Sequence, residues 1–207
     1  MKKSQIKKRF IYLISPNKIK SKKFYYQLDS IFKTKKVSFF QLRLKKEKEK
    51  NKLEIGKKIK NICKKNNVKF IINDDPFLAN KLNSDGCHLG QKDMKIENAR
   101  KILKNKIIGL TCHNSLKLVK QSIRSKADYI AIGAFYKSKT KKNKFRAKIK
   151  LLKSIKKITK IPVVAIGGIN NVNYKNLLLN KANFLAISGY IWNNKKLKPL
   201  EAVKKII

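Results

Sequence analysis

The stretch KFIINDDPFLANKLNSDGCHLG (69–90) decides the fold. It contains two short apolar runs, 69–73 and 86–90, and a more polar segment joins them. Buried strands of a parallel sheet have near-continuous apolar runs of this length. The stretch therefore predicts a strand, a short helical connection and a second strand parallel to the first.

The same alternation continues along the chain. Apolar runs of four to eight residues, rich in Ile, Val, Phe or Tyr, alternate with Lys-rich amphipathic stretches such as 53–65. The runs are 10–15, 38–44, 69–73, 86–90, 107–112, 129–135, 162–167 and 184–191. Eight such units in 207 residues predict an α/β fold, a single-domain (β/α)8 TIM barrel over residues 1–207, at the short end of that fold's size range. A doubly wound open sheet is the structural alternative.

The charge of the chain allows two interpretations. With 54 Lys and Arg against 11 Asp and Glu, the formal net charge is +43, which first suggests nucleic acid. However, 49 of the basic residues are Lys and only 5 are Arg, although base and phosphate recognition favours Arg. Lys, Ile and Asn share AT-rich codons, so we favour compositional drift of the genome and expect no specific nucleic acid partner.

Other features of composition bear on the compartment. No apolar run approaches the roughly 20 residues of a membrane helix, and the run at 10–14 is too short for a signal peptide. The three cysteines, Cys63, Cys87 and Cys112, are far apart and odd in number, which suits a reducing compartment. We therefore expect a cytoplasmic protein with no membrane partner, and the sequence leaves a homo-oligomer open.

In a barrel of this kind the active site lies where the strands end. The chain has few acids, yet Asp74 and Asp93 follow neighbouring strands of the predicted sheet. Two carboxylates in one pocket repel each other unless a cation lies between them, and Mg²⁺ uses one or two carboxylates together with water and substrate phosphate. A magnesium site and simple salt bridges to lysines are both consistent with this placement.

Three further strand ends carry features that suit anions. Alternation within QLRLK (41–45) places Gln41, Arg43 and Lys45 on one inward face, where buried positive charge is costly unless it meets an anion. Gly167-Gly168 and Ser188 lie at the ends of the last two strands, where this fold commonly binds phosphate. The residues thus predict an enzyme that joins a diphosphate donor to a phosphorylated acceptor.

The chain resembles the thiamine phosphate synthase family along nearly its full length. The similar segments are YLIS (12–15), QLRLK (41–45), IINDD (71–75), DGCHLGQKDM (85–94), IIGLTCH (107–113), ADYIAIGAF (127–135), SKTK (138–141), IPVVAIGGI (161–169) and FLAIS (184–188). The resemblance implies a (β/α)8 barrel that couples 4-amino-2-methyl-5-(diphosphooxymethyl)pyrimidine to thiazole phosphate, with release of pyrophosphate and formation of thiamine phosphate. These small molecules are the partners that it implies.

The resemblance also implies roles for residues that match the family's motifs. Those for the pyrimidine diphosphate are Gln41, Arg43, Lys45, Asn73, Thr111 and Lys141, with Thr111 standing where the family usually has Ser. Asp74 and Asp93 match its Mg²⁺ ligands, and Mg²⁺ is the implied cofactor. Those for the thiazole phosphate are Ser138, Thr140, Gly168, Ile187 and Ser188. We further expect Tyr12, His88 and Gln91 at the pocket, although for His88 a hydrogen-bonded place in the interior is equally consistent.

The family's chemistry needs no nucleophilic side chain, because the carbon–oxygen bond to pyrophosphate breaks first and the thiazole nitrogen then attacks. The loop 133–141 departs from the family pattern: two prolines are lost and one Thr becomes Ser. The nearest alternative is the related thiazole tautomerase, which shares the barrel but needs no diphosphate site with Mg²⁺.

Overall fold

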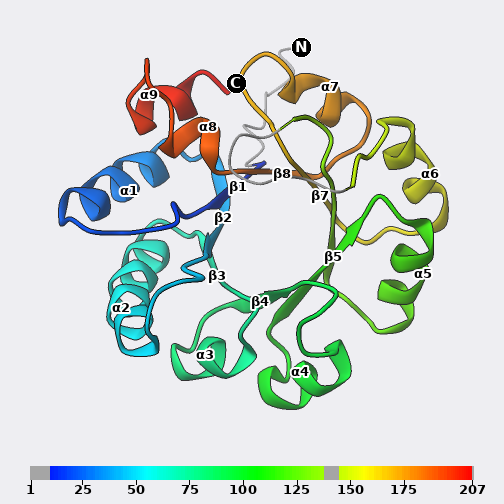
Figure 1. Ribbon diagram of the computed structural model, residues 1–207, viewed down its shortest axis with the longest axis horizontal. Helices are drawn as coiled ribbons and strands as arrows, with labels where there is room; N and C mark the ends of the chain where they lie inside the picture. Colours follow the sequence, from blue (N-terminus) through cyan, green and yellow to red (C-terminus); the bar gives the residue numbers. More distant parts are fainter. Residues whose placement is uncertain (1–9, 138–144, 207) are drawn as a thin grey trace, which may run out of the picture.

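The computed structural model describes residues 10–137 and 145–206. Within this part, parallel strands close into a barrel in sequence order, β1 to β8, as Figure 1 shows. The strands are β1 Ile11–Ile14, β2 Val37–Leu42, β3 Lys69–Asn73, β4 Gly86–Leu89, β5 Ile107–His113, β6 Tyr129–Gly133, β7 Val163–Ile166 and β8 Phe184–Ile187. The predicted (β/α)8 barrel is confirmed, and the open sheet is wrong because β1 also pairs with β8.

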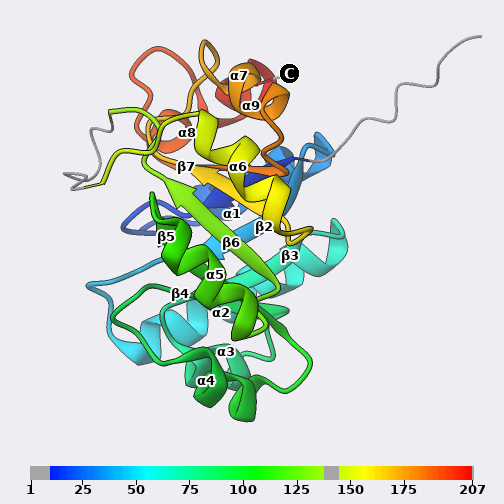
Figure 2. The same cartoon turned by 90° about the vertical axis from the view of Figure 1, so that its right-hand side faces the viewer.

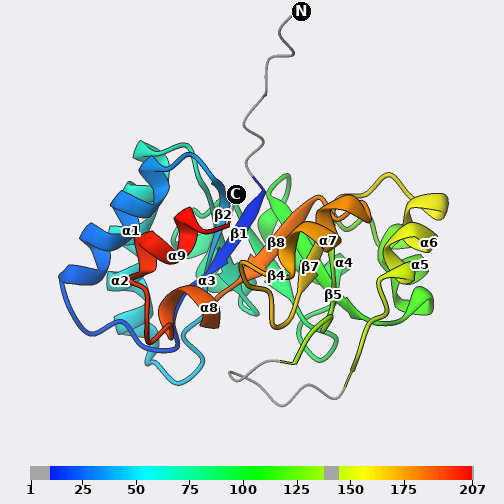
Figure 3. The same ribbon diagram turned by 90° about the horizontal axis from the view of Figure 1, so that it is seen from above.

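The helices form a ring outside the strands (Figure 1). They are α1 Lys23–Lys33, α2 Glu49–Lys65, α3 Pro76–Lys81, α4 Ile96–Leu103, α5 Leu116–Arg124, α6 Lys150–Ile158 and α7 Tyr174–Leu179, followed after β8 by α8 Gly189–Trp192 and α9 Pro199–Lys204. Seen from above, α1, α2 and α9 lie on one side of the barrel and α5 and α6 on the other (Figure 3). In the view of Figure 2, α5 and α6 lie in front of the strands.

Two buried apolar clusters hold these layers together. The larger lies between strands and helices and includes Leu28, Ile59 and Val119. The smaller consists of Tyr12, Ile14, Tyr129, Ala131, Val164 and Ala186, which alternate with the first set along their strands. Aromatic rings pack within this second cluster, with 5.3 Å between the ring centres of Tyr12 and Phe39. The barrel interior is therefore filled by side chains, as this fold requires.

Side-chain N-caps mark the first turns of two helices, α3 and α5. The Asp75 carboxylate accepts a hydrogen bond from the Leu78 N–H at 2.9 Å, and Pro76 occupies the first turn, where its missing N–H costs nothing. Ser115 caps α5 in the same way through the Leu118 N–H, at 3.3 Å. The first of these caps fixes the backbone directly after the carboxyl end of β3.

Most of the expected runs extend beyond the strands of the structure, and two of them show why. The run 38–44 leaves the sheet after Leu42, although its alternation continues: Leu44 stays buried and Lys45 is exposed. The run 184–191 divides after Ile187, because α8 begins at Gly189. The Trp192 ring N–H of α8 donates to the Ile14 carbonyl oxygen at 2.7 Å and so ties this helix to the end of β1.

Two simple findings concern the compartment. Among the described residues, no helix has both the length and the apolar character that crossing a membrane demands. Cys63, Cys87 and Cys112 are all buried free thiols.

Candidate active site

The carboxyl ends of β3 and β4 bring two acids together at one rim of the barrel. Asp74 directly follows β3, has a φ of 64°, and donates its backbone N–H to the His88 carbonyl oxygen at 2.7 Å. Asp93 lies in the turn after β4, where its Oδ2 accepts the Gly90 N–H at 2.6 Å. The two carboxyl groups lie close enough for each to shift the pKa of the other. The predicted meeting of Asp74 and Asp93 is thus observed.

The pKa values of these two acids shift in opposite directions. Burial raises the pKa of Asp93 above its ordinary value, and the neighbouring Asp74 charge adds to the rise. Burial acts in the same direction on Asp74, but its bond to Lys45 and its contact with Asp93 outweigh this and lower its pKa. Without a cation, the pair is therefore most stable with one charge rather than two.

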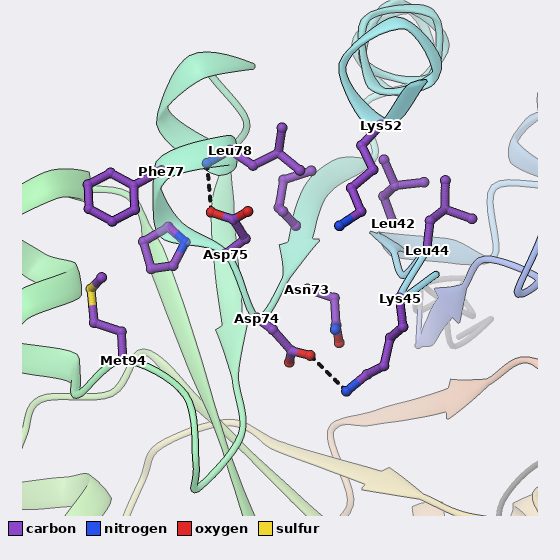
Figure 4. A pocket seen from close by; sticks show the side chains of 12 residues that line it. Leu42, Leu44, Lys45, Lys52, Asn73, Asp74, Asp75, Phe77, Leu78 and Met94 are labelled. Carbon is purple, nitrogen blue, oxygen red and sulfur yellow. Dashed lines mark hydrogen bonds and ion pairs between the residues drawn. The ribbon is translucent and has the colours of Figure 1, made fainter. Parts of the chain in front are cut away.

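Beside this pair lies a hollow of about 520 Å³ between the ends of β2 and β3 (Figure 4). Lys45 enters it from the loop after β2, and its ammonium lies 2.9 Å from Asp74 Oδ2. Asn73, the last residue of β3, also lines the hollow. Figure 4 shows the Lys45 and Asp74 side chains pointing toward one another. Three of the predicted site residues thus share one wall.

Gln41 and Arg43 come from the same end of β2 but do not line the hollow, which Leu42 and Leu44 face instead. Gln41 is buried and donates from its side-chain amide to the Tyr12 hydroxyl at 3.2 Å. Arg43 is half-buried just after the strand, and its backbone N–H donates to the Ser15 hydroxyl at 2.9 Å. Among the described residues no side-chain hydrogen bond or ion pair is found for the Arg43 guanidinium, so the guanidinium is available to an anion.

His88 has a hydrogen bond at each ring nitrogen. Its Nδ1 lies 2.9 Å from the Tyr129 hydroxyl, and its Nε2 lies 2.8 Å from the Thr111 hydroxyl. Tyr129 is in turn 2.7 Å from the Tyr12 hydroxyl. Burial lowers the pKa of His88 to about 4, which keeps the ring neutral. The structure thus places His88 and Tyr12 in the barrel interior, with Thr111 as their link to the rim.

Gln91 lies at the rim over β5. Its side-chain amide donates a hydrogen bond to the Thr111 carbonyl oxygen, although most of Gln91 is exposed. It is therefore close to Thr111 but does not line the hollow, and its place at the pocket stays a prediction.

The ends of β7 and β8 form the second predicted anion region. Gly168 has a φ of 64°, and a Cβ added there would lie 2.4 Å from the Lys137 carbonyl oxygen, so only glycine fits. Ile187 ends β8 as a buried residue, and the Ser188 hydroxyl donates to the Ser15 carbonyl oxygen at 3.2 Å. Since Ile166 of β7 pairs with Ala186 of β8, Gly168 and Ser188 follow adjacent strand ends. Ser138, Thr140 and Lys141 lie outside the described residues.

A family model described as thiamine monophosphate synthase matches residues 11–191. The chain belongs to this family. The thiamine-phosphate synthase of Pelagibacter ubique (strain HTCC1062) is 68% identical over 206 residues, which cover 100% of both chains. That of Rhodospirillum centenum (strain ATCC 51521 / SW) is 34% identical over 186 residues and 89% of each chain.

Solved structures agree. The thiamine phosphate pyrophosphorylase of Pyrococcus furiosus superposes with a TM-score of 0.84 at 26% identity, over 96% of this chain and 93% of that one. A 3-hexulose-6-phosphate synthase, with a TM-score of 0.65 at 15% identity over 95% of this chain and 98% of that one, shares the fold alone. The predictions of a thiamine phosphate synthase and of a transferase are confirmed, and the comparisons give the tautomerase no support.

The sequence did not reveal every residue of this family member's site. Tyr129 contacts both Tyr12 and His88, but the sequence marks it only as part of an apolar strand. Its alternation with Ala131 on the interior face could have placed it inside the barrel. Lys52, Phe77 and Met94 line the hollow from helices and a loop, where no strand alternation marks them.

Proposed function

We propose that this chain condenses 4-amino-2-methyl-5-(diphosphooxymethyl)pyrimidine with thiazole phosphate, and that thiamine phosphate and pyrophosphate are the products. The observation that carries the proposal is the proximity of the Asp74 and Asp93 carboxyl groups at the rim, with the Lys45 ammonium 2.9 Å from Asp74 Oδ2. Neighbouring carboxylates next to basic groups suit a metal-bound diphosphate, because the diphosphate carries more negative charge than one lysine can balance.

The donor set of the rim fits Mg²⁺. Two carboxylates in contact are costly when both are charged, and a divalent cation removes that cost. Among the described residues there is no cluster of three or more His, Cys, Asp and Glu side chains that could hold a metal. Asp74 and Asp93 would therefore supply two oxygens, with water and substrate phosphate as the remaining ligands. When bound, the ion would stabilise the negative charge that develops on the departing pyrophosphate.

The chain's own residues would bind the diphosphate and stabilise its departure. Arg43 and Lys45 place positive charge at the rim next to Asn73, and such groups act most strongly where charge develops in the transition state. Lys141 is proposed for the same task from its motif. The bond to pyrophosphate breaks, the pyrimidine retains a positive charge, and the thiazole nitrogen supplies the electron pair for the new bond.

The second substrate would bind at the ends of β7 and β8. Gly168, Ile187 and Ser188 follow or end adjacent strands, and the positive φ of Gly168 opens its backbone to a phosphate. Ser138 and Thr140 are proposed contacts of the thiazole ring. The two anions would then approach each other across the same rim, as a condensation requires.

Small-molecule substrates thus remain the only partners proposed. A cytoplasmic location is proposed as well, and the three buried free thiols are compatible with it. A homo-oligomer stays a prediction.

Replacement of one carboxylate tests the metal site. We expect Asp93→Asn to keep the fold, since an amide oxygen can still accept the Gly90 N–H, but to lower turnover by about 100-fold, because removal of even an outer partner of a bound metal costs about 10- to 100-fold. The matched control is Glu54→Gln, which removes an equal charge from an exposed position on α2. Near-normal turnover of Asp93→Asn in saturating Mg²⁺ would exclude the assignment.

A further inference from the structure

Five side chains form a continuous hydrogen-bonded chain through the barrel interior. The Gln41 amide nitrogen lies 3.2 Å from the Tyr12 hydroxyl, which lies 2.7 Å from the Tyr129 hydroxyl. Tyr129 continues to His88 Nδ1 at 2.9 Å, and His88 Nε2 continues to the Thr111 hydroxyl at 2.8 Å. Its two ends, Gln41 and Thr111, are residues of the proposed diphosphate site. The three members between them have no role in that proposal.

The hydrogen bond between Gln41 and Tyr12 determines which group donates at each later step. An amide NH₂ group only donates, so the Tyr12 oxygen accepts from Gln41. Tyr12 is 2% exposed, and a buried hydroxyl proton without an acceptor is costly. Within the described part of the chain, the Tyr129 oxygen is the remaining hydrogen-bond partner of the Tyr12 hydroxyl. Tyr12 therefore donates to Tyr129.

The same requirement, that a buried hydroxyl donate its proton to an acceptor, applies to Tyr129. Tyr129 is also buried, accepts from Tyr12, and has His88 Nδ1 as its other partner. Its proton must then go to Nδ1. A neutral imidazole carries one proton, so that proton lies on Nε2 and is donated to Thr111.

At Thr111 the row of hydrogen-bonded side chains reaches the rim of the barrel. Its hydroxyl oxygen accepts from His88, so its own proton remains free to be donated elsewhere. Thr111 is half-buried at the carboxyl end of β5, near the exposed Gln91. The hydroxyl thus faces the site as a donor rather than as an acceptor.

We propose that Tyr129 is a positioning residue, which holds His88 with its proton on Nε2 so that the Thr111 hydroxyl donates to an acceptor atom of the pyrimidine diphosphate. This rests on the proposed function. The packing of Tyr129 supports it: the ring stacks on His88 with 5.5 Å between ring centres and 17° between planes. Gly109 of β5 makes room for the ring, since a Cβ there would lie 2.0 Å from Tyr129 Cζ.

Nitrogen NMR of the imidazoles tests the direction without substrate. The chain has only two histidines, so the variant His113→Asn leaves His88 as the single imidazole. We expect the proton of His88 on Nε2, and Nδ1 with the shift of a nitrogen that accepts a hydrogen bond. In Tyr129→Phe, Nδ1 should move toward the shift of an unbonded acceptor. A proton on Nδ1 in the parent protein overturns the proposal, whether or not the variant folds.

A matched control separates this effect from the loss of any buried hydroxyl. Tyr174 is also buried, and its hydroxyl has no hydrogen-bond partner within the described residues. Tyr174→Phe should therefore leave both His88 nitrogens unchanged. A shift as large as that of Tyr129→Phe would show that the spectrum reports general loosening of the barrel, and would overturn the proposal.

Enzyme kinetics test whether Tyr129 acts on the substrate through Thr111. Tyr129→Phe should lower kcat/KM for the pyrimidine diphosphate about tenfold, as expected for one lost hydrogen bond, and leave the KM of thiazole phosphate unchanged. In a Thr111→Val background the same change should have little further effect, since residues that act in series are not additive. Independent, multiplicative losses would overturn the proposal. A parent protein that forms no thiamine phosphate would instead overturn the proposed function, while the nitrogen spectrum still reports the direction.

Discussion

At the scale of single residues, the barrel keeps a neutral histidine next to a charged rim. Burial lowers the pKa of His88 to about 4; the Asp74 charge opposes this, and the nearby Arg43 charge adds a smaller lowering. In the unfolded chain the same ring titrates near its ordinary value of about 6.5. Between these two values the unfolded state binds more protons than the folded state, so acid favours unfolding.

This difference predicts how stability depends on pH. The contribution of His88 is complete above about pH 6.5 and is lost as the pH falls toward about 4, with a loss of about 2 kcal/mol at pH 5. Urea unfolding at pH 7 and pH 5 measures it, with His88→Gln to remove the titration and His113→Asn as the control that keeps it. An equal pH dependence in the parent protein and in His88→Gln would contradict the burial of a neutral ring.

Most of the rim could be predicted at the residue scale because it follows directly from strand ends. Asp74, Asp93, Lys45 and Asn73 meet because parallel strands end at one edge. The sequence could not show that His88 and Tyr12 turn into the interior, since this depends on Tyr129, forty-one residues from His88 along the chain. Hydrogen bonds over such separations leave no local pattern.

At the scale of elements, the packing of the Tyr129 ring of β6 over β5 depends on a glycine. Gly109 pairs with Tyr129 across these strands, and the tyrosine ring occupies the space where a Cβ would lie. Because the ring is part of the interior hydrogen-bonded chain, the glycine of β5 and the placement of His88 are linked.

We therefore expect Gly109→Ala to lower the free energy of unfolding by about 1–3 kcal/mol, as overpacking of a core does. The control is Gly56→Ala in α2, where the added methyl meets only the end of the flexible Leu82 side chain and Ala is the better helix former. Urea unfolding of both variants provides the comparison. A loss for Gly56→Ala as large as that for Gly109→Ala would show that the tyrosine ring is not the cause.

Apolar runs located every strand, but element boundaries were less predictable. α8 lies within a run that resembles one long strand, because Tyr190, Ile191 and Trp192 suit either state. A tertiary contact favours the helix: the Trp192 ring N–H donates to the carbonyl oxygen of Ile14, on a strand at the other end of the chain. Likewise β2 ends at Leu42 although apolar alternation continues to Leu44.

At the scale of the whole molecule, the net charge of +43 is a source of self-repulsion. The described ion pairs, such as Lys69–Asp85 and Lys33–Asp29, lie on the surface and contribute little. Both proposed substrates are anions, so the positive surface would also attract them over a distance that salt shortens.

Salt should consequently stabilise the fold. Raising NaCl from about 50 mM to about 500 mM shortens the screening length severalfold, weakens the repulsion between lysines and should raise Tm. Thermal unfolding followed by circular dichroism measures this. Sucrose, added as an uncharged control, separates screening from general effects of solutes. A Tm that falls or stays constant as NaCl rises would contradict self-repulsion as the dominant effect of the charge.

The central claim is that the assembled rim makes thiamine phosphate with the help of Mg²⁺. The most direct measurement incubates the metal-free full-length protein with pyrimidine diphosphate and thiazole phosphate, titrates Mg²⁺, and quantifies thiamine phosphate and pyrophosphate. We expect both products in equal amounts, with a rate that rises with Mg²⁺ to saturation. Isomerisation of thiazole phosphate without formation of thiamine phosphate would contradict the account. So would a rate of thiamine phosphate formation that does not depend on the Mg²⁺ concentration.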